Sequence, residues 1–107
     1  MSRSERELLV EALAHFDLLV RHASGDIDDQ LVIDAVCMRL SAGLEVLGRI
    51  GGDRRAALFG DDWTLMWGMR NRIAHGYLLV DPEIIRRTLE ADIPVIVGRL
   101  RAAVAER

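Results

Sequence analysis

The residues best suited to chemistry lie in one short run, residues 70–77. The run carries a permanent cation at Arg70, an amide at Asn71, an imidazole at His75 and a phenol at Tyr77. An Arg can hold a phosphate and stabilise its developing charge, and a His can accept or donate a proton. These two groups are the minimum set for cleaving a phosphodiester bond, and that chemistry requires neither a metal ion nor another cofactor.

Each side chain of the run has a distinct role in such a reaction. His75 would take the proton of an RNA 2′-OH or give one to the leaving oxygen. Arg70 would hold the scissile phosphate, and the product would carry a 2′,3′-cyclic phosphate. Asn71 would orient His75 or the backbone around it, and Tyr77 would bind substrate or stack on a base. Arg72 is a further candidate for contact with RNA, because an Arg fork suits a phosphate.

The spacing of the two catalytic candidates favours a site shared between two chains. On a helix that turns by ~100° per residue, Arg70 and His75 point ~140° apart, so they need not touch within one chain. Arg70 also lies on an otherwise apolar side, where a charge needs a partner from its own chain or from a second subunit. Gly68 in mid-helix lowers helix stability by ~1 kcal/mol relative to Ala. Either a closely packed partner helix or evolutionary drift would explain a Gly at this position.

The run resembles a known signature. Arg, four residues, His, one residue and Tyr is the spacing of the HEPN superfamily, and residues 69–77 resemble the core of HepT-like ribonuclease toxins almost residue for residue. Trp63 fits the aromatic residue that begins that family's motif helix, and residues 92–94 resemble its Asp-Leu-Pro turn. The resemblance covers about residues 34–100. One departure is Gly43-Leu44-Glu45, where the family usually has an adjacent Gly-Glu pair.

The resemblance implies a biological role and partners. It implies a homodimer with a cleft at its two-fold axis, acting as the endoribonuclease toxin of a toxin–antitoxin pair. The antitoxin would be a minimal nucleotidyltransferase (MntA-like) that transfers AMP to Tyr77. The rival hypothesis is a non-catalytic helical dimer, a binding module for a nucleotidyltransferase or a nucleic acid. His75→Ala would abolish function only under the catalytic hypothesis.

Length and composition predict one folded domain over residues 1–107. Half of the residues are apolar and 29% are charged, which is typical of a globular chain. No signal peptide or apolar run of ~20 residues is present, and the single Cys37 fits a reducing compartment, so we expect a cytoplasmic protein without membrane contact.

The net charge of −3 is not typical of a nucleic-acid-binding protein. Any basic groove would therefore have to come from a local cluster of arginines. All fourteen basic residues are Arg, which genomic base composition explains as well as phosphate binding does. The arginines that could gather beside Arg70 and Arg72 are Arg54, Arg55, Arg86 and Arg87.

Helical patterns run through the whole chain. Ser4 and Glu7 form a capping box for the first helix, and a second helix is expected from about Asp29 to Gly48. A short helix should cover residues 53–59, and the motif helix should run from Asp61 or Asp62 to near His75. The last helix begins at Asp81-Pro82, and Pro94 should kink or break it. Residues 77–80 are a doubtful strand. The sequence therefore predicts an all-α, up-and-down bundle of four main helices plus a short one.

Three other groups of residues have a weaker claim to function. His15 and His22, with Asp17 or Glu11, could suggest a metal site, but ligand pairs on a helix are usually four residues apart. Cys37 fits a buried, inert thiol. The acidic cluster at residues 26–29 lacks the Gly and Glu of a calcium loop, so a solvated turn and N-cap is the better interpretation.

Overall fold

The computed structural model of the chain describes residues 3–76 and 81–106. These residues form helices, turns and short connections, and no strand occurs among them. The doubtful strand at residues 77–80 lies outside the described residues. The elements in chain order are α1 (Glu5–His22), α2 (Gln30–Leu47), α3 (Gly52–Phe59), α4 (Asp62–Gly76), α5 (Pro82–Arg87), a π-helical turn η2 (Thr88–Asp92) and α6 (Ile93–Ala105).

The predicted helix boundaries are confirmed because local capping fixes them. The Ser4 hydroxyl accepts a hydrogen bond from the backbone N–H of Glu7 (3.1 Å) and donates one to the Glu7 carboxylate (3.0 Å). The carboxylates of Asp29 and Asp81 cap α2 and α5, and Gly60 ends α3 with a φ of 56°.

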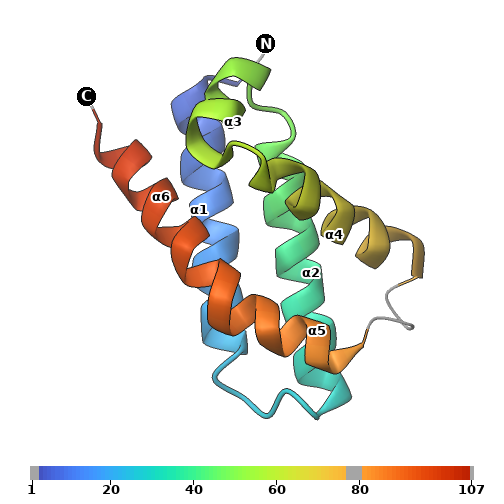
Figure 1. Cartoon of the computed structure of the whole chain (residues 1–107). Helices are drawn as coiled ribbons and strands as arrows, with labels where there is room; N and C mark the ends of the chain where they lie inside the picture. Colours follow the sequence, from blue (N-terminus) through green and yellow to red (C-terminus); the bar gives the residue numbers. More distant parts are fainter. Residues whose placement is uncertain (1–2, 77–80, 107) are drawn as a thin grey trace.

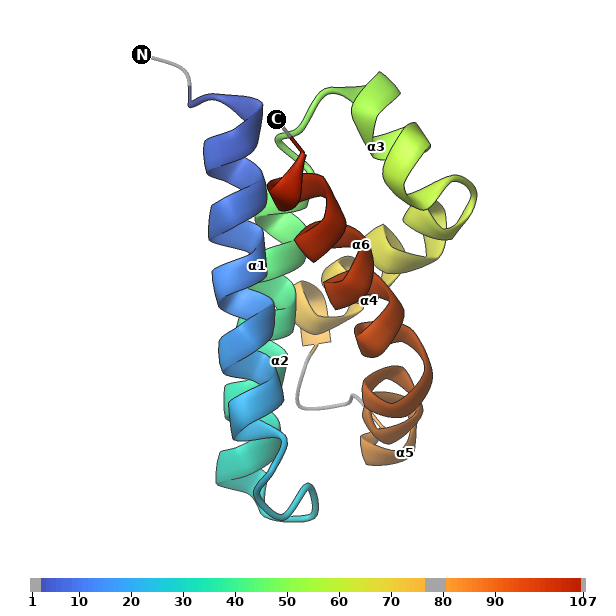
Figure 2. The same cartoon turned by 90° about the vertical axis from the view of Figure 1, so that its left-hand side faces the viewer.

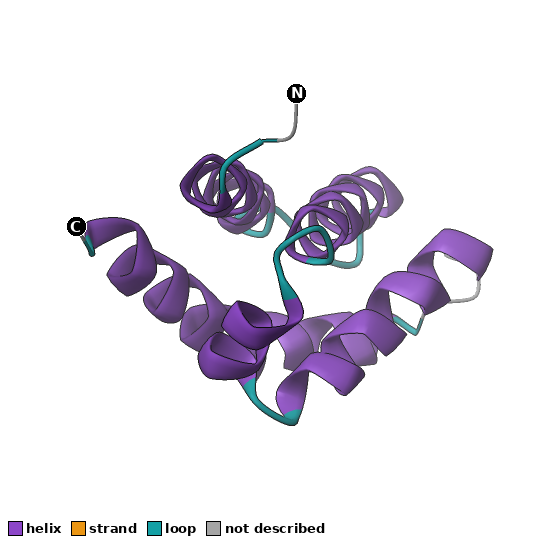
Figure 3. Cartoon of the chain, turned by 90° about the horizontal axis from the view of Figure 1, so that it is seen from above, coloured by secondary structure: helices purple, strands orange, loops and turns teal. Residues whose placement is uncertain are grey.

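The helices lie in two layers. The antiparallel helices α1 and α2 lie side by side in one layer, and α4 and α5–α6 form a V beneath them when the molecule is seen from above (Figures 1 and 3). Helix α4 packs on α2, and α6 packs on α1. The all-helical class predicted from the sequence is therefore confirmed for the described residues, with α4 and α6 inclined to the α1–α2 pair.

The core lies between the α1–α2 pair and the α5–α6 run. Its largest fully buried side chains are Phe16, Leu19, Val36, Leu40, Leu44, Leu47, Ile85, Ile93 and Leu100. Helices α1 and α2 approach closely at Gly43, where an added Cβ would lie 2.8 Å from the Phe16 ring. Helix α4 contributes only Ile73 to the buried residues. The motif helix is therefore a half-exposed element that rests on a core made by the other helices.

The predicted disturbance at Pro94 takes the form of a π-helical turn. Pro94 has no backbone N–H, so it cannot donate the regular helical hydrogen bond to the preceding turn. The backbone N–H of Ile93 instead reaches back to the carbonyl of Thr88, five residues earlier. The helical run continues without a break and changes direction in this region (Figure 2). None of the helices described is both long enough and apolar enough to span a membrane.

Candidate active site

The predicted catalytic residues lie on the last two turns of α4. Arg70, Asn71, Arg72 and His75 are all helical, and the helix ends at Gly76. Tyr77, the predicted substrate contact and site of modification, lies outside the described residues. Helix α4 therefore fixes the relative directions of four of the five predicted site residues.

Arg70 is a charged residue on an otherwise apolar side of α4, and it has an acidic partner within its own chain. Its Nη2 atom lies 2.6 Å from Oε2 of Glu45, on the facing helix α2. Its Nη1 atom donates a hydrogen bond to Oδ1 of Asn71 (3.0 Å), and its guanidinium lies over the Trp67 ring, 4.8 Å from the centroid. Three groups therefore hold this one guanidinium.

The pair between Arg70 and Glu45 is half-buried. The Arg70 side chain is 25% exposed and the Glu45 side chain 40% exposed. Although the two atoms are 2.6 Å apart, Oε2 of Glu45 lies outside the directional range of a hydrogen bond, so Coulombic attraction holds the pair. The Nε atom of Arg70 is buried and has no hydrogen-bond partner among the described residues.

Arg70 packs against the end of a row of three aromatic rings, Phe59, Trp63 and Trp67. The rings of Trp63 and Trp67 are 5.6 Å apart, and Phe59 extends the row at 6.2 Å from Trp63. Arg55 lies over Trp63 at 4.9 Å, and its Nη1 donates hydrogen bonds to the carbonyls of residues 48 and 50. Each end of the Trp63–Trp67 pair therefore carries a guanidinium, and favourable cation–π contacts fix both.

His75 and Asn71 are not brought together in the described contacts. His75 is exposed on the last turn of α4. Asn71 shares the helix face of His75 by spacing, but its described hydrogen bond is with Arg70. All the contacts of Arg70 described here lie on one side of α4 and on α2, whereas His75 projects from another side. Within this chain, Arg70 and His75 therefore point to different places.

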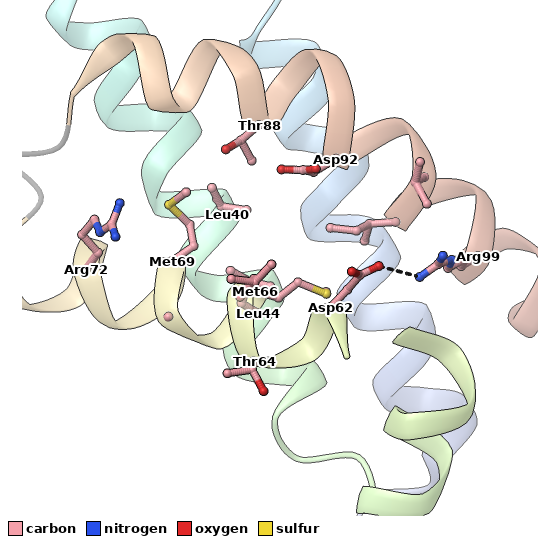
Figure 4. A pocket seen from close by; sticks show the side chains of 14 residues that line it. Leu40, Leu44, Asp62, Thr64, Met66, Met69, Arg72, Thr88, Asp92 and Arg99 are labelled. Carbon is pink, nitrogen blue, oxygen red and sulfur yellow. Dashed lines mark ion pairs between the residues drawn. The ribbon is translucent and has the colours of Figure 1, made fainter. Parts of the chain in front are cut away.

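Arg72 points into a separate cleft, between α4 and the α5–α6 run (Figure 4). The cleft encloses about 420 Å³, and its floor includes Leu40 and Leu44 of α2. Arg72 lies at one end of it, and the ion pair between Asp62 and Arg99 (3.5 Å) lies at the other. Since Arg70 faces Glu45 of α2 instead, the two arginines do not form one basic groove within the chain.

The expectation that more arginines gather beside Arg70 is wrong for Arg54 and Arg86. Arg54 pairs with the carboxylates of Glu5 and Glu106 (2.8 Å each), close to the two ends of the described chain. Arg86 pairs with Glu83 and Asp28 (3.1 Å each). These cations neutralise local carboxylates, so the described surface around Arg70 gains no positive charge from them.

His15, Cys37 and Asp29, from the three weaker candidate groups, have structural contacts. His15 Nδ1 lies 3.2 Å from Nη1 of Arg39, and no group of three or more His, Cys, Asp or Glu within residues 3–76 and 81–106 could hold a metal ion. Cys37 is 3% exposed, and burial, with the charge of Asp34 second, raises its thiol pKa to about 11. Asp29 is the N-cap of α2, as expected.

Glu45 and Trp67 are the contacts of the site that the sequence alone did not assign. The available signal was the charged Arg70 on an apolar side, which called for an acidic partner on a neighbouring helix. The facing helix α2 offers two acidic residues, Asp34 and Glu45, and helix packing decides between them.

Comparison with protein families gives one match. The model of the family HepT-like, described as Ribonuclease HepT-like, matches residues 9–103, which include α2, α4 and all the contacts of Arg70 described above. Searches of curated proteins and of solved structures gave no match to the chain.

Proposed function

Because the chain belongs to the HepT-like ribonuclease family, we propose that it is an endoribonuclease toxin that cuts RNA without a metal ion. Arg70 binds the scissile phosphate and stabilises the charge that grows on it during attack by the 2′-OH. His75 accepts the proton of the 2′-OH or donates one to the leaving oxygen. The products carry a 2′,3′-cyclic phosphate and a free 5′-OH.

The observation that carries the proposal is the divergence of Arg70 and His75 on α4. Arg70 is held against α2 by Glu45, and His75 is exposed on another side of the helix. A proton carrier and a phosphate-binding cation must both reach the same phosphodiester, within about 3 Å of the reacting atoms. This divergence supports a homodimer in which Arg70 of one protomer and His75 of the other form each site across a two-fold axis.

A cleavage assay in EDTA tests the activity. We expect the native protein to cut total RNA or tRNA and to leave cyclic phosphate ends. His75→Ala and Arg70→Ala dimers of unchanged helicity should both be inactive. Cleavage that needs added divalent ion would contradict the metal-independent mechanism.

A mixing experiment tests the shared site. Arg70→Ala and His75→Ala chains are each inactive as homodimers, but a mixed dimer regains one complete site if the residues come from different protomers. With random pairing, half of the dimers are mixed and each has one of two sites, so roughly a quarter of native activity should return. If both residues act within one chain, mixing restores nothing.

Regulation by a partner follows from the same family. We propose that a minimal nucleotidyltransferase antitoxin transfers AMP to Tyr77 and silences the toxin. Tyr77 is two residues beyond His75 in the chain, so an adenylyl group adds bulk and negative charge close to the proton carrier. Mass analysis after co-expression with the antitoxin should find AMP on Tyr77, and an inactive complex with unmodified Tyr77 would contradict the idea.

A second candidate function is a non-catalytic binding module, and the ion pair of Arg70 with Glu45 favours it. That contact shows that Arg70 has a partner within its own chain even without RNA. In such a module, His75→Ala would leave function intact, and removal of exposed arginines such as Arg72 would impair it. Tight RNA or nucleotidyltransferase binding without cleavage would support the module.

A further inference from the structure

We propose that Glu45 is a positioning residue for RNA cleavage, acting through Arg70. The inference rests on the proposed function, because it concerns the cation assigned to the scissile phosphate. Glu45 lies in the last turn of α2, a helix with many buried residues, whereas Arg70 lies on the half-exposed α4. A carboxylate on the more deeply packed helix is well placed to hold the guanidinium in one orientation.

The donors of Arg70 show what this orientation leaves for a substrate. A guanidinium has five N–H groups: one on Nε and two on each terminal nitrogen. The Nε atom is buried, one N–H of Nη1 goes to Asn71, and Nη2 faces Glu45. At least one N–H on each terminal nitrogen therefore remains for an outside ligand. Two such donors can contact two oxygens of one phosphate, which is the strong bidentate mode of Arg.

Trp67 and Glu45 restrict different motions of the same group. Cζ of Arg70 lies over the Trp67 ring, 4.8 Å from its centroid, so the indole limits movement of the guanidinium toward the ring. Glu45 lies 2.6 Å from one terminal nitrogen, so its charge limits rotation of the guanidinium away from α2. An Arg side chain is otherwise rich in rotamers, and a displacement of about 1 Å in a catalytic group can cost 10²-fold in rate.

The charge of Glu45 argues against a role in binding substrate. A carboxylate beside the phosphate site repels RNA, so it weakens ground-state binding rather than strengthening it. Its contribution to folding is also small, since half-exposed ion pairs stabilise proteins little. The remaining benefit is the alignment of Arg70, which acts on the rate of the bound complex.

Two variants of Glu45 separate the alignment of Arg70 from the repulsion of RNA. Glu45→Ala frees the guanidinium, and we expect kcat to fall by about 10- to 100-fold while KM stays equal or falls. Glu45→Gln keeps the length of the side chain but removes the charge that holds Nη2 of Arg70, so kcat should also fall by about tenfold or more while KM falls. The matched control is Asp17→Ala, which removes an ion pair with Arg101 (2.8 Å) between α1 and α6, and kcat should be native.

A second readout does not depend on activity. The ¹⁵N signal of the Arg70 Nε–H group, assigned by its loss in Arg70→Lys, reports the order of the side chain. It should be rigid in the native protein and in Asp17→Ala, and mobile in Glu45→Ala and Glu45→Gln.

The outcomes separate this inference from the proposed function. A kcat at or above native in Glu45→Ala or Glu45→Gln, or an equally rigid Arg70 in either variant, would each overturn the positioning role. If the native protein cuts no RNA, the ribonuclease function fails, and the order of Arg70 still decides whether Glu45 positions it.

Discussion

Gly48 at the end of α2 lies directly against the indole of Trp67 on α4. A Cβ added at Gly48 would lie 2.8 Å from Cζ3 and 3.0 Å from Cη2 of that ring. The same indole also contacts the guanidinium of Arg70, whose Cζ atom lies 4.8 Å from the ring centroid. The absence of a side chain at position 48 therefore decides where Trp67 sits, and Trp67 in turn supports the phosphate-binding candidate.

Gly48→Ala should displace Trp67 and loosen Arg70. Overpacking of this kind costs about 1–3 kcal/mol, and 1 kcal/mol corresponds to a fall of about 4–8 °C in the melting temperature of a domain this small. Thermal unfolding and RNA cleavage of the variant check both effects. In a Trp67→Leu background the same change should be almost harmless, because the clash is gone. An equal loss of stability from Gly48→Ala in both backgrounds would refute the contact between position 48 and Trp67.

Gly68→Ala tests whether a second subunit approaches α4. An added Cβ at Gly68 meets nothing within 4 Å in the described chain, so the variant should stabilise the monomer by about 1 kcal/mol through helix propensity. If a partner helix packs there, the same variant should weaken dimerisation in analytical ultracentrifugation. Gly98→Ala on α6 is the matched control, since its Cβ is equally free. Identical dimer affinities for both variants would place the interface elsewhere.

Cys37 should make the fold sensitive to high pH. Burial raises its pKa from 9.0 to about 11, so the unfolded thiol ionises first and the folded thiol stays neutral. The unfolded state then binds fewer protons than the folded state, and the free energy of unfolding falls between pH 9 and 11 by about 1 kcal/mol per pH unit. Urea unfolding at several pH values measures this slope. Cys37→Ala should lose that component, and an unchanged slope would argue against the raised pKa.

Arg70→Lys should not rescue the activity lost in Arg70→Ala. A Lys keeps the charge, but its single ammonium cannot contact Asn71, Glu45 and a phosphate in one fixed plane or stack on Trp67 in the same way. We expect kcat at least about tenfold below native, because the alignment of the cation is lost. Recovery of native kcat in this variant would show that charge alone is needed at position 70.

Local signals explain why the helix boundaries could be predicted. Ser4, Asp29 and Asp81 cap their helices through backbone N–H groups two or three residues away, so the sequence alone contains both partners. Gly60 and Pro94 act through their own backbone chemistry, which also needs no tertiary context. The motif at residues 70–77 and its resemblance to a family could likewise be recognised from the sequence, since both depend on the spacing of residues along one short segment.

The partners of the arginines could not be predicted, because they depend on how distant helices meet. Arg54 contacts Glu5 and Glu106, which are separated by almost the whole chain. Arg70 and Arg72 are two residues apart, yet one faces Glu45 of α2 and the other faces the cleft beside α5–α6. Side-chain directions on α4 become meaningful only once the neighbouring helices are in place.

The two indole rings on α4 give this site an intrinsic spectroscopic signal. The chain contains two tryptophans, and their rings lie 5.6 Å apart. At such a separation the excited states of the two indoles couple, which produces a paired circular-dichroism band of opposite signs. Arg70 lies over one indole and Arg55 over the other, so a guanidinium that moves or polarises its ring changes the band. We therefore expect a phosphate that binds Arg70 and shifts Trp67 to change the ultraviolet spectrum of the unlabelled protein.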